Sequence, residues 1–167
     1  MKAIVAVDKE WGIGKGNDLL FRIPEDMKFF KEMTTHKVVL MGRVTWDSLG
    51  HIPLPNRTNL ILTGQKSLVA NGVDCYIGNE QYISELIKNH YDTEDIFVIG
   101  GQKIYEKYLY ECNEIFVTRY NRHYKGADKF FPDLSKEPAF EMKEILHEGF
   151  HEDKKYQITR WINTRLI

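Results

Sequence analysis

The sequence predicts an α/β fold with a central, mainly parallel, twisted sheet, helices on both of its faces and an antiparallel C-terminal edge. As far as Leu109, short apolar and β-branched stretches alternate with segments of helical spacing, an order that is typical of parallel sheets. After Leu109 the chain continues in longer β-rich stretches with no helical segment between them. These later stretches are expected to add antiparallel strands to one edge of the sheet.

Five short stretches rich in apolar and β-branched residues are expected to form buried strands, because Gly, Pro, Asn or charged residues bound each of them. They cover residues 3–7, 38–41, 59–63, 73–77 and 96–99. Apolar residues at helical spacing predict helices over residues 25–34, 44–49, 81–90 and 102–109. Three further strands are expected at residues 114–120, 141–146 and 156–162, with Gly126, Pro132, Pro138 and Gly149 separating the stretches.

Length and continuity favour a single domain over residues 1–167. The chain has a usual size for one compact unit, and no internal repeat, low-complexity tract or linker marks a boundary. The 23 Lys and Arg residues balance 24 Asp and Glu residues without any block of like charges. A basic face for nucleic acid is therefore not expected. No long exposed apolar helix face is evident, so the expected state is a monomer.

Compartment and metal content follow from a few residue types. The apolar stretch from Ala3 to Val7 is too short for a signal peptide or a membrane span, so no membrane association is expected. Cys75 and Cys112 lie far apart and form no CxxC motif, which does not indicate a disulfide framework. The histidines lack the spacing of metal ligands. We therefore expect a cytoplasmic protein without a metal site.

Residues 12–17 have the sequence Gly-Ile-Gly-Lys-Gly-Asn, which differs from the dinucleotide-binding fingerprint GxGxxG in the spacing of its glycines. No helical pattern follows, so a pyrophosphate could not rest on a helix N-terminus at this position. A segment of about fifteen residues without regular structure is uncommon in a compact domain. We interpret it either as a lid over a binding site or as a surface loop without a role.

Asp26 stands in the first turn of the first expected helix, after Pro24 and Glu25. Helical geometry places Asp26, Met27 and Phe30 within an arc of ~100°. One interpretation is a solvated carboxylate that the helix dipole favours. If this face lines a cleft instead, desolvation raises the carboxylate pKa toward neutrality, while its oxygens accept a bidentate pair of N–H donors. Such an acid suits an amidine-like heterocycle and a proton-assisted step.

Two expected strands end at glycines that directly precede an expected helix, at Gly42 and at Gly100-Gly101. Free N–H groups and the helix dipole attract phosphate at such turns, and paired glycines let the backbone approach a ligand closely. Two phosphate-accepting turns in one small domain suit a dinucleotide. The cations that follow strand ends either converge on a second anionic group, such as a ribose 2′-phosphate, or are ordinary surface residues. These cations are Arg43, Lys66 and Lys103.

Arg57 directly precedes an expected strand, on a backbone that Pro53 and Pro55 stiffen. A rigidly held guanidinium suits bidentate capture of a carboxylate. The alternative is an arginine that faces solvent.

Four motifs resemble dihydrofolate reductase, and they occur in the order in which that family carries them. PEDMKFFK (24–31) resembles the family's substrate helix, and MGRVTWDSLG (41–50) resembles its MGRxTWxSxG block. LPNRTNLIL (54–62) resembles LPxRxNxxL, and FVIGGQKIY (97–105) resembles xxIGGxxxY. The resemblance covers almost the whole chain. It implies an NADPH-dependent reductase that converts 7,8-dihydrofolate to 5,6,7,8-tetrahydrofolate for one-carbon metabolism and also binds antifolate-type small molecules.

Carried over position by position, the resemblance implies that Asp26 binds the 2-amino group and a ring nitrogen of the pterin and supports protonation at nitrogen 5. Thr118 would bridge to that carboxylate, and Phe21 belongs with these two as a catalytic residue. The expected substrate-binding residues are Ala6, Met27, Phe30, Leu49, Arg57 and Thr118, with Arg57 paired to the glutamyl carboxylate. The expected cofactor-binding residues are Ala6, Ile13, Gly14, Asn17, Leu19, Gly42, Arg43, Val44, Thr45, Leu62, Thr63, Gly64, Lys66, Ile99, Gly100, Gly101, Lys103, Ile104 and Tyr105. The resemblance also implies a cis peptide bond between Gly100 and Gly101 and a mobile lid over residues 10–21.

Two positions depart from the family pattern. Leu20-Phe21 stands where Pro-Trp is usual, so an N–H donor that commonly holds an ordered water near the pterin is missing. Gly64 stands where a hydroxyl or cationic side chain often meets the 2′-phosphate, which leaves that contact to Lys66 and Lys103.

Two other functions stay open on the sequence. One is a binding module that keeps both pockets but has lost turnover, and the other is a reductase of the same fold that acts on a pyrimidine intermediate of riboflavin synthesis. Asp26 together with Arg57 favours dihydrofolate over the pyrimidine, because the pyrimidine carries no glutamyl tail for an arginine to bind.

Overall fold

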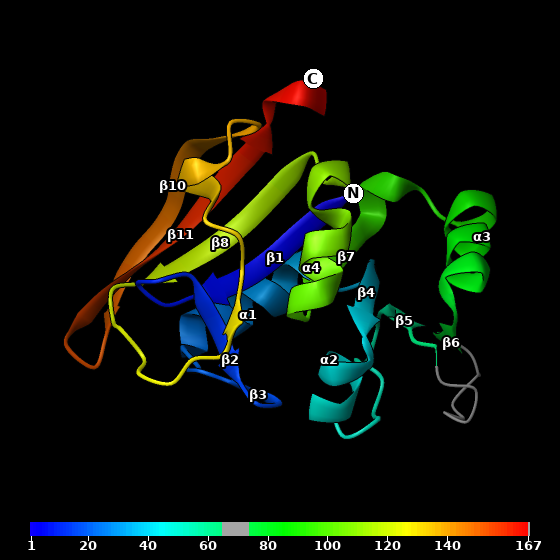
Figure 1. The fold of residues 1–167 in the computed structure, drawn as a ribbon, viewed down its shortest axis with the longest axis horizontal. Helices are drawn as coiled ribbons and strands as arrows, with labels where there is room; N and C mark the ends of the chain where they lie inside the picture. Colours follow the sequence, from blue (N-terminus) through cyan, green and yellow to red (C-terminus); the bar gives the residue numbers. More distant parts are fainter. Residues whose placement is uncertain (65–73, 167) are drawn as a thin grey trace.

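The computed structural model describes residues 1–64 and 74–166, and a sheet of eight strands forms the centre of this part of the chain (Figure 1). Across the sheet the strands are β10 (Phe140–His151), β11 (Lys154–Asn163), β8 (Glu114–Tyr120), β1 (Lys2–Val7), β7 (Ile96–Gly100), β4 (Val38–Gly42), β5 (Thr58–Leu62) and β6 (Cys75–Gly78). Every pair from β8 to β6 is parallel, whereas β11 pairs antiparallel with both β8 and β10. The predicted mainly parallel sheet with an antiparallel C-terminal edge is therefore confirmed.

Helices cover both faces of the sheet, as predicted. α3 (Glu80–His90) and α4 (Gln102–Tyr108) pack on one face, where Ile83 and Tyr105 join a buried core that includes residues of β1, β4, β7 and β8. α1 (Pro24–Thr34) packs on the other face, where Phe29 and Phe116 belong to one cluster. α2 (Arg43–Ser48) covers that same face through the buried Trp46. Because alternate residues of a strand point to opposite faces, the strands from β8 to β6 contribute to both layers.

Residues 12–19 form a short hairpin, which corrects the prediction of a segment without regular structure. β2 (Gly12–Lys15) pairs antiparallel with β3 (Asp18–Leu19) and with β9 (Lys129–Phe130), which makes a second sheet of three strands. We call residues 12–19 the lid hairpin. Its glycines carry no apolar alternation, and its partner β9 lies far away along the chain. No local pattern could therefore indicate this pairing.

The C-terminal hairpin is longer than predicted, because β10 continues to His151 and β11 begins at Lys154. Gly149, expected between two strands, lies within β10, where a Cβ would stand only 2.5 Å from the hydroxyl oxygen of Tyr156. Most of β10 is exposed, so it has no buried face whose periodicity could reveal its length. At the other edge of the sheet β6 begins at Cys75, while Val73 of the predicted strand lies outside the described residues.

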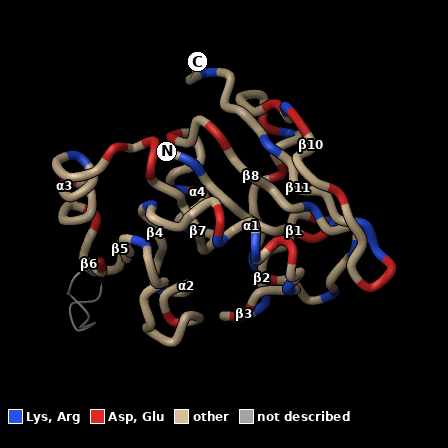
Figure 2. The backbone as a smooth tube through the Cα atoms, turned by 180° about the vertical axis from the view of Figure 1, so that it is seen from behind, with Lys and Arg blue, Asp and Glu red and all other residues tan. Residues whose placement is uncertain are grey.

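The short remaining elements are 3₁₀ turns at Thr93–Asp95, Leu109–Glu111, Leu134–Lys136 and Thr164–Leu166. Positive and negative residues are interleaved along the described chain (Figure 2). None of its helices is long and apolar enough to cross a membrane. Cys75 and Cys112 are buried and free. Within residues 1–64 and 74–166, no group of three or more His, Cys, Asp or Glu side chains could hold a metal ion.

Gly42 allows the start of α2 to pack closely against α4. A Cβ built on Gly42 would stand 2.6 Å from Cγ1 of Ile104 and 3.3 Å from its Cδ1. β4 and β7 are neighbours, and Met41 lies opposite Gly100 in their register. The two glycine turns therefore lie beside each other at the carboxyl ends of adjacent parallel strands, the edge at which α/β sheets bind ligands.

Gly42→Ala is expected to lower the free energy of unfolding by about 1–3 kcal/mol, because the added methyl group overpacks the contact with Ile104. Urea denaturation would report this loss as a lower midpoint at an unchanged m value. Ile104→Ala removes Cγ1, so the glycine substitution should cost less in that background. Equal costs in both backgrounds would show that the Ile104 contact does not cause the loss.

Candidate active site

Asp26 lies where the first turn of α1 crosses the sheet. Its Oδ1 accepts a hydrogen bond of 2.5 Å from the hydroxyl of Thr118 on β8, and Ala6 on β1 is the direct neighbour of Thr118 in the parallel register. α1 starts here because Pro24 suits the first helical position. The residue before it, Ile23, is fully buried in the core. Asp26 therefore faces the sheet, and the interpretation of a solvated carboxylate is wrong.

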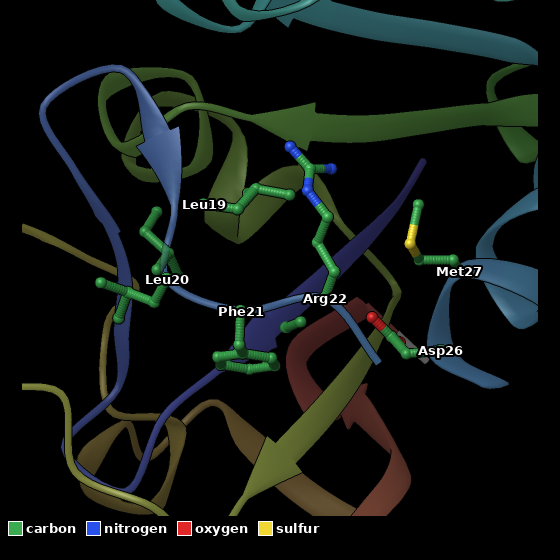
Figure 3. Close-up of a pocket in the computed structure, with 8 residues that line it drawn as sticks. Leu19, Leu20, Phe21, Arg22, Asp26 and Met27 are labelled. Carbon is green, nitrogen blue, oxygen red and sulfur yellow. The ribbon is translucent and has the colours of Figure 1, made fainter. Parts of the chain in front are cut away.

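The cleft beside Asp26 has walls that are mostly apolar (Figure 3). Its lining residues are Ala6, Ile13, Leu19, Leu20, Phe21, Arg22, Asp26 and Met27. Figure 3 shows Asp26 and Met27 of α1 on one side of the cleft, with Leu19 and Leu20 on the other. Burial raises the pKa of Asp26 to about 6, and the hydrogen bond from Thr118 opposes the shift. The carboxyl group therefore titrates close to neutral pH.

Arg22 is a cleft residue that sequence analysis missed, and Leu20 was considered only as a departure from the family pattern. Both line the cleft, and Arg22 is exposed. In Figure 3 the Arg22 side chain extends from the segment that joins β3 to α1, away from Asp26. The only available signal was proximity along the chain, because both residues lie between the glycine-rich segment and Asp26.

Phe21 forms part of an aromatic group at the base of the cleft. Its ring centroid lies 5.0 Å from that of Tyr120 and 5.6 Å from that of Tyr124, with the second pair stacked. Offset aromatic pairs of this kind hold the ring in one orientation. A phenyl ring has no hydrogen-bond donor, so Phe21 contributes an apolar wall to the cleft and cannot hold a water molecule through an N–H group.

Arg57 is buried beneath α1, which excludes the alternative of a solvent-facing arginine. Only 7% of it is exposed, its Nε donates to the carbonyl of Pro55 at 2.9 Å, and its Nη1 donates to the Thr34 hydroxyl at 3.0 Å. The guanidinium carbon lies 5.9 Å from the ring centroid of the half-buried Phe30, and burial lowers the pKa of Arg57. Among the described residues no carboxylate forms a salt bridge with it. This charge is therefore available to an anionic ligand.

The two glycine turns fit the phosphates of a dinucleotide. Gly42 precedes α2 and Gly101 precedes α4, and a side chain caps neither helix start, so backbone N–H groups stay available there. The Gly100–Gly101 peptide bond is cis, as the family resemblance implies, and Gly100 has φ +118°. A Cβ on Gly100 would stand 3.2 Å from Thr45 Oγ1 and 3.2 Å from the Tyr105 ring. Glycine suits this position because a side chain would be strained at this φ and crowded by Thr45 and Tyr105.

Tyr105 supports the double-glycine turn from behind. It is almost fully buried, and its hydroxyl donates to the carbonyl of Ile4 at 2.7 Å. Burial raises the pKa of Tyr105, and the charge of Asp26 adds to the shift. Ile4 lies on β1 two residues before Ala6, which lines the cleft beside Asp26. β1 therefore connects the support of the turn to the cleft.

The other residues expected at the substrate and cofactor fall into separate places. Ile13, Gly14, Asn17 and Leu19 belong to the lid hairpin, and two of them, Ile13 and Leu19, line the cleft. Val44 and Thr45 follow Arg43 at the start of α2, where Arg43 is exposed and pairs with Asp47 at 2.9 Å. Leu62 ends β5 and is followed by Thr63 and Gly64, Ile99 lies in β7, Lys103 is exposed on α4, and Leu49 packs against the Trp46 cluster. Lys66 lies outside the described residues.

The chain is similar to dihydrofolate reductases by each comparison. The family model described as dihydrofolate reductase matches residues 1–165. Dihydrofolate reductase of Buchnera aphidicola subsp. Baizongia pistaciae (strain Bp) is 34% identical over 148 residues, which cover 87% of each chain. That of Staphylococcus haemolyticus is 34% identical over 152 residues, which cover 91% of this chain and 86% of the other. The structure of dihydrofolate reductase from Enterococcus faecalis complexed with NADP(H) and RAB-propyl superposes with a TM-score of 0.78 at 29% identity, covering 96% and 94% of the two chains.

Asp26→Asn is expected to stabilise the fold at about pH 8 and to have little effect at about pH 4, because only the charged acid is penalised by burial. The folded-state pKa of about 6 lies above the ordinary value of 3.8. The stability that the bound proton contributes is therefore complete below the unfolded pKa and is lost as the pH rises through 6. A shift of ~2 pKa units corresponds to at most about 3 kcal/mol. The amide oxygen can still accept from Thr118.

Urea denaturation of wild type and variant at the two pH values measures the difference. A difference in unfolding free energy that is the same at both would contradict the raised pKa.

Proposed function

Because the chain belongs to the dihydrofolate reductase family, we propose that the cleft between α1 and the lid hairpin is its active site, with Asp26 at its centre. The protein is an NADPH-dependent reductase that converts 7,8-dihydrofolate to 5,6,7,8-tetrahydrofolate. It thereby supplies tetrahydrofolate for one-carbon metabolism. One observation carries the proposed site. The Asp26 carboxyl group lies in a mostly apolar cleft, accepts a hydrogen bond from Thr118 and has a pKa of about 6.

Asp26 would hold the pterin through a bidentate hydrogen bond. Its two oxygens accept from the 2-amino group and a ring N–H, a geometry that matches a carboxylate to an amidine-like edge. Thr118 donates to Oδ1 and fixes the plane of the carboxyl group. With its pKa raised to about 6, Asp26 supports the uptake of a proton at nitrogen 5, while a hydride is added to carbon 6. Antifolate-type molecules that present the same donor pair would occupy the same position.

NADPH supplies the hydride when it is bound. Residues at the two glycine turns would hold it: Gly42, Arg43, Val44 and Thr45 at α2, and Gly100, Gly101, Lys103 and Ile104 at α4. Backbone N–H groups at these helix starts would bind phosphate oxygens. The lid hairpin, with Ile13 and Leu19 facing the cleft, would exclude water from the reacting atoms.

Arg57 would bind a carboxylate of the glutamyl tail. The contacts of the guanidinium to Pro55 and Thr34 fix its plane before the substrate arrives, so little side-chain entropy is lost on binding. Met27 at the cleft edge and Phe30 beside Arg57 would form an apolar path between the pterin and the tail, with Leu49 on the opposite side.

We extend the proposal to a single domain over residues 1–167 that acts as a cytoplasmic monomer. One buried cluster contains residues from both ends of the described chain, including Met1 and Trp161, which supports a single unit. The free, buried Cys75 and Cys112 agree with a reducing compartment. The monomer is proposed from the sequence alone.

Addition of dihydrofolate to the purified protein is expected to oxidise NADPH, followed as a loss of nicotinamide absorbance. Asp26→Asn should lower kcat/KM by roughly 10²–10⁴ at neutral pH, the range typical of a general acid or base, while the Kd for NADPH stays unchanged. If wild-type protein bound NADPH and an antifolate without any turnover, it would be a binding module instead of an enzyme.

The kcat/KM of the wild-type protein is expected to fall by about tenfold per pH unit once the pH rises well above the Asp26 pKa of about 6, because the protonated fraction falls in that proportion. Asp26→Asn should lack the inflection near pH 6. Initial rates from about pH 5 to pH 9 measure both profiles. An inflection that persists in the variant would assign the titration to a different group.

Arg57→Lys is expected to raise the KM for dihydrofolate roughly tenfold or more, because an ammonium group cannot make the bidentate, charge-assisted pair. The matched measurement uses a dihydropterin without a glutamyl tail, whose kcat/KM should stay close to that of the wild type. Equal losses with both substrates would mean that Arg57 supports the fold and does not read the tail. A wild-type preference for a pyrimidine without a tail would favour the riboflavin-type reductase.

A further inference from the structure

Gln102, the first residue of α4, connects the double-glycine turn to the lid. Its Oε1 accepts a hydrogen bond of 2.8 Å from the backbone N–H of Phe130 in β9, and its Nε2 donates to Glu106 Oε1 at 3.0 Å. The partners fix the orientation of the amide, because an N–H requires the oxygen and a carboxylate requires the NH₂ group. Glu106 therefore holds the acceptor oxygen toward β9.

β9 pairs with β2 of the lid hairpin, and it lies between β2 and α4 (Figure 1). Gly12 and Gly14 of β2 pair with Phe130 and Lys129. The Asp128 carboxylate accepts from the N–H of Gly16 at 3.0 Å, at the turn of the hairpin. Among the hydrogen bonds of the described residues, the one from Phe130 to Gln102 joins α4 to this three-stranded sheet. A continuous path therefore leads from the turn at Gly101 through Gln102 and β9 to the residues that cover the cleft.

We propose that Gln102 is a positioning residue that couples cofactor binding at the Gly100-Gly101 turn to the placement of the lid hairpin over the cleft. This inference rests on the proposed function for the location of the cofactor. A phosphate bound at the turn orders the first residue of α4, and Gln102 transmits that order to β9 through one backbone N–H. Because coupling between sites is reciprocal, a correctly placed lid strengthens cofactor binding by the same factor.

Gln102 touches neither the substrate nor the reacting atoms in this arrangement, so its effect differs from that of a catalytic residue. Removing the acceptor frees the Phe130 N–H while Phe131, the next residue, stays packed against Tyr105 at a centroid distance of 4.9 Å. β9 therefore remains in place and loses only its hydrogen bond to Gln102, the contact that connects the Gly100-Gly101 turn to the lid hairpin.

Gln102→Met tests the proposal, because methionine keeps the length of the side chain and lacks the acceptor. Gln81→Met is the matched control. Gln81 also lies in the first turn of a helix and donates a hydrogen bond to the acid four residues later, Glu85. α3 packs on β5 and β6, at the edge of the sheet away from the lid hairpin (Figure 1). The readouts are the NADPH Kd, measured by fluorescence, and hydrogen exchange of residues 12–19 with and without NADPH.

In the wild type and in Gln81→Met, NADPH should slow exchange across the lid hairpin. In Gln102→Met this protection should be lost, and NADPH should bind roughly three- to tenfold more weakly, the loss expected from one hydrogen bond. The kcat at saturating NADPH should change less than the KM for NADPH.

Asp128→Ala provides the second variant, because it releases the lid turn from β9 at Gly16. If Gln102 acts through the lid, its substitution should weaken NADPH binding much less in this background than in the wild type. Full lid protection by NADPH in Gln102→Met, or equal losses of affinity in both backgrounds, would overturn the coupling and leave the proposed function intact. A wild-type protein that does not bind NADPH would overturn the proposed function itself, and the coupling with it.

Discussion

The hydrogen bond between Thr118 and Asp26 is the contact on which the site depends. It joins the start of α1 to the centre of the sheet, and it fixes the plane of the only acid among the residues that line the cleft. Two opposed effects set the pKa of that acid: burial raises it strongly and the Thr118 hydroxyl lowers it, with a result of about 6. Without the hydroxyl the carboxyl group would lose its orientation and keep its proton to a higher pH.

The topology of the sheet brings the partner of that acid, Thr118, to the same edge as the two glycine turns. β1 lies between β8 and β7, and β7 lies beside β4, so Thr118, the Gly100-Gly101 turn and Gly42 all occupy the carboxyl-terminal part of adjacent parallel strands. This is the edge at which helices of an α/β fold begin and at which their N-terminal N–H groups are available. The two turns can lie this close only if residue 42 has no side chain, because Ile104 fills the space that a side chain there would need.

The sequence was sufficient to predict the elements with buried faces. The parallel strands and all four helices occur within a few residues of their predicted bounds, since each has an apolar pattern that burial requires. The lid hairpin and the full length of β10 were missed for one physical reason: their residues are small or exposed, and long-range backbone pairing holds them. Among site residues, Thr118 bonds Asp26 as the family resemblance implied, and Ala6 lies beside Thr118. Arg22 was not part of that resemblance, and its place in the cleft appears only once the chain is folded.

The segment before α1 departs from the family pattern, while Asp26 beside it keeps its hydrogen bond with Thr118. Leu20 and Phe21 stand where a proline and a tryptophan are usual, so neither of these side chains offers an N–H group to the cleft. Phe21 is held instead by the rings of Tyr120 and Tyr124, so this position stays packed. An apolar wall disfavours the charged carboxylate. Burial in this cleft raises the pKa of Asp26, and the hydroxyl of Thr118 is the side-chain group that lowers it.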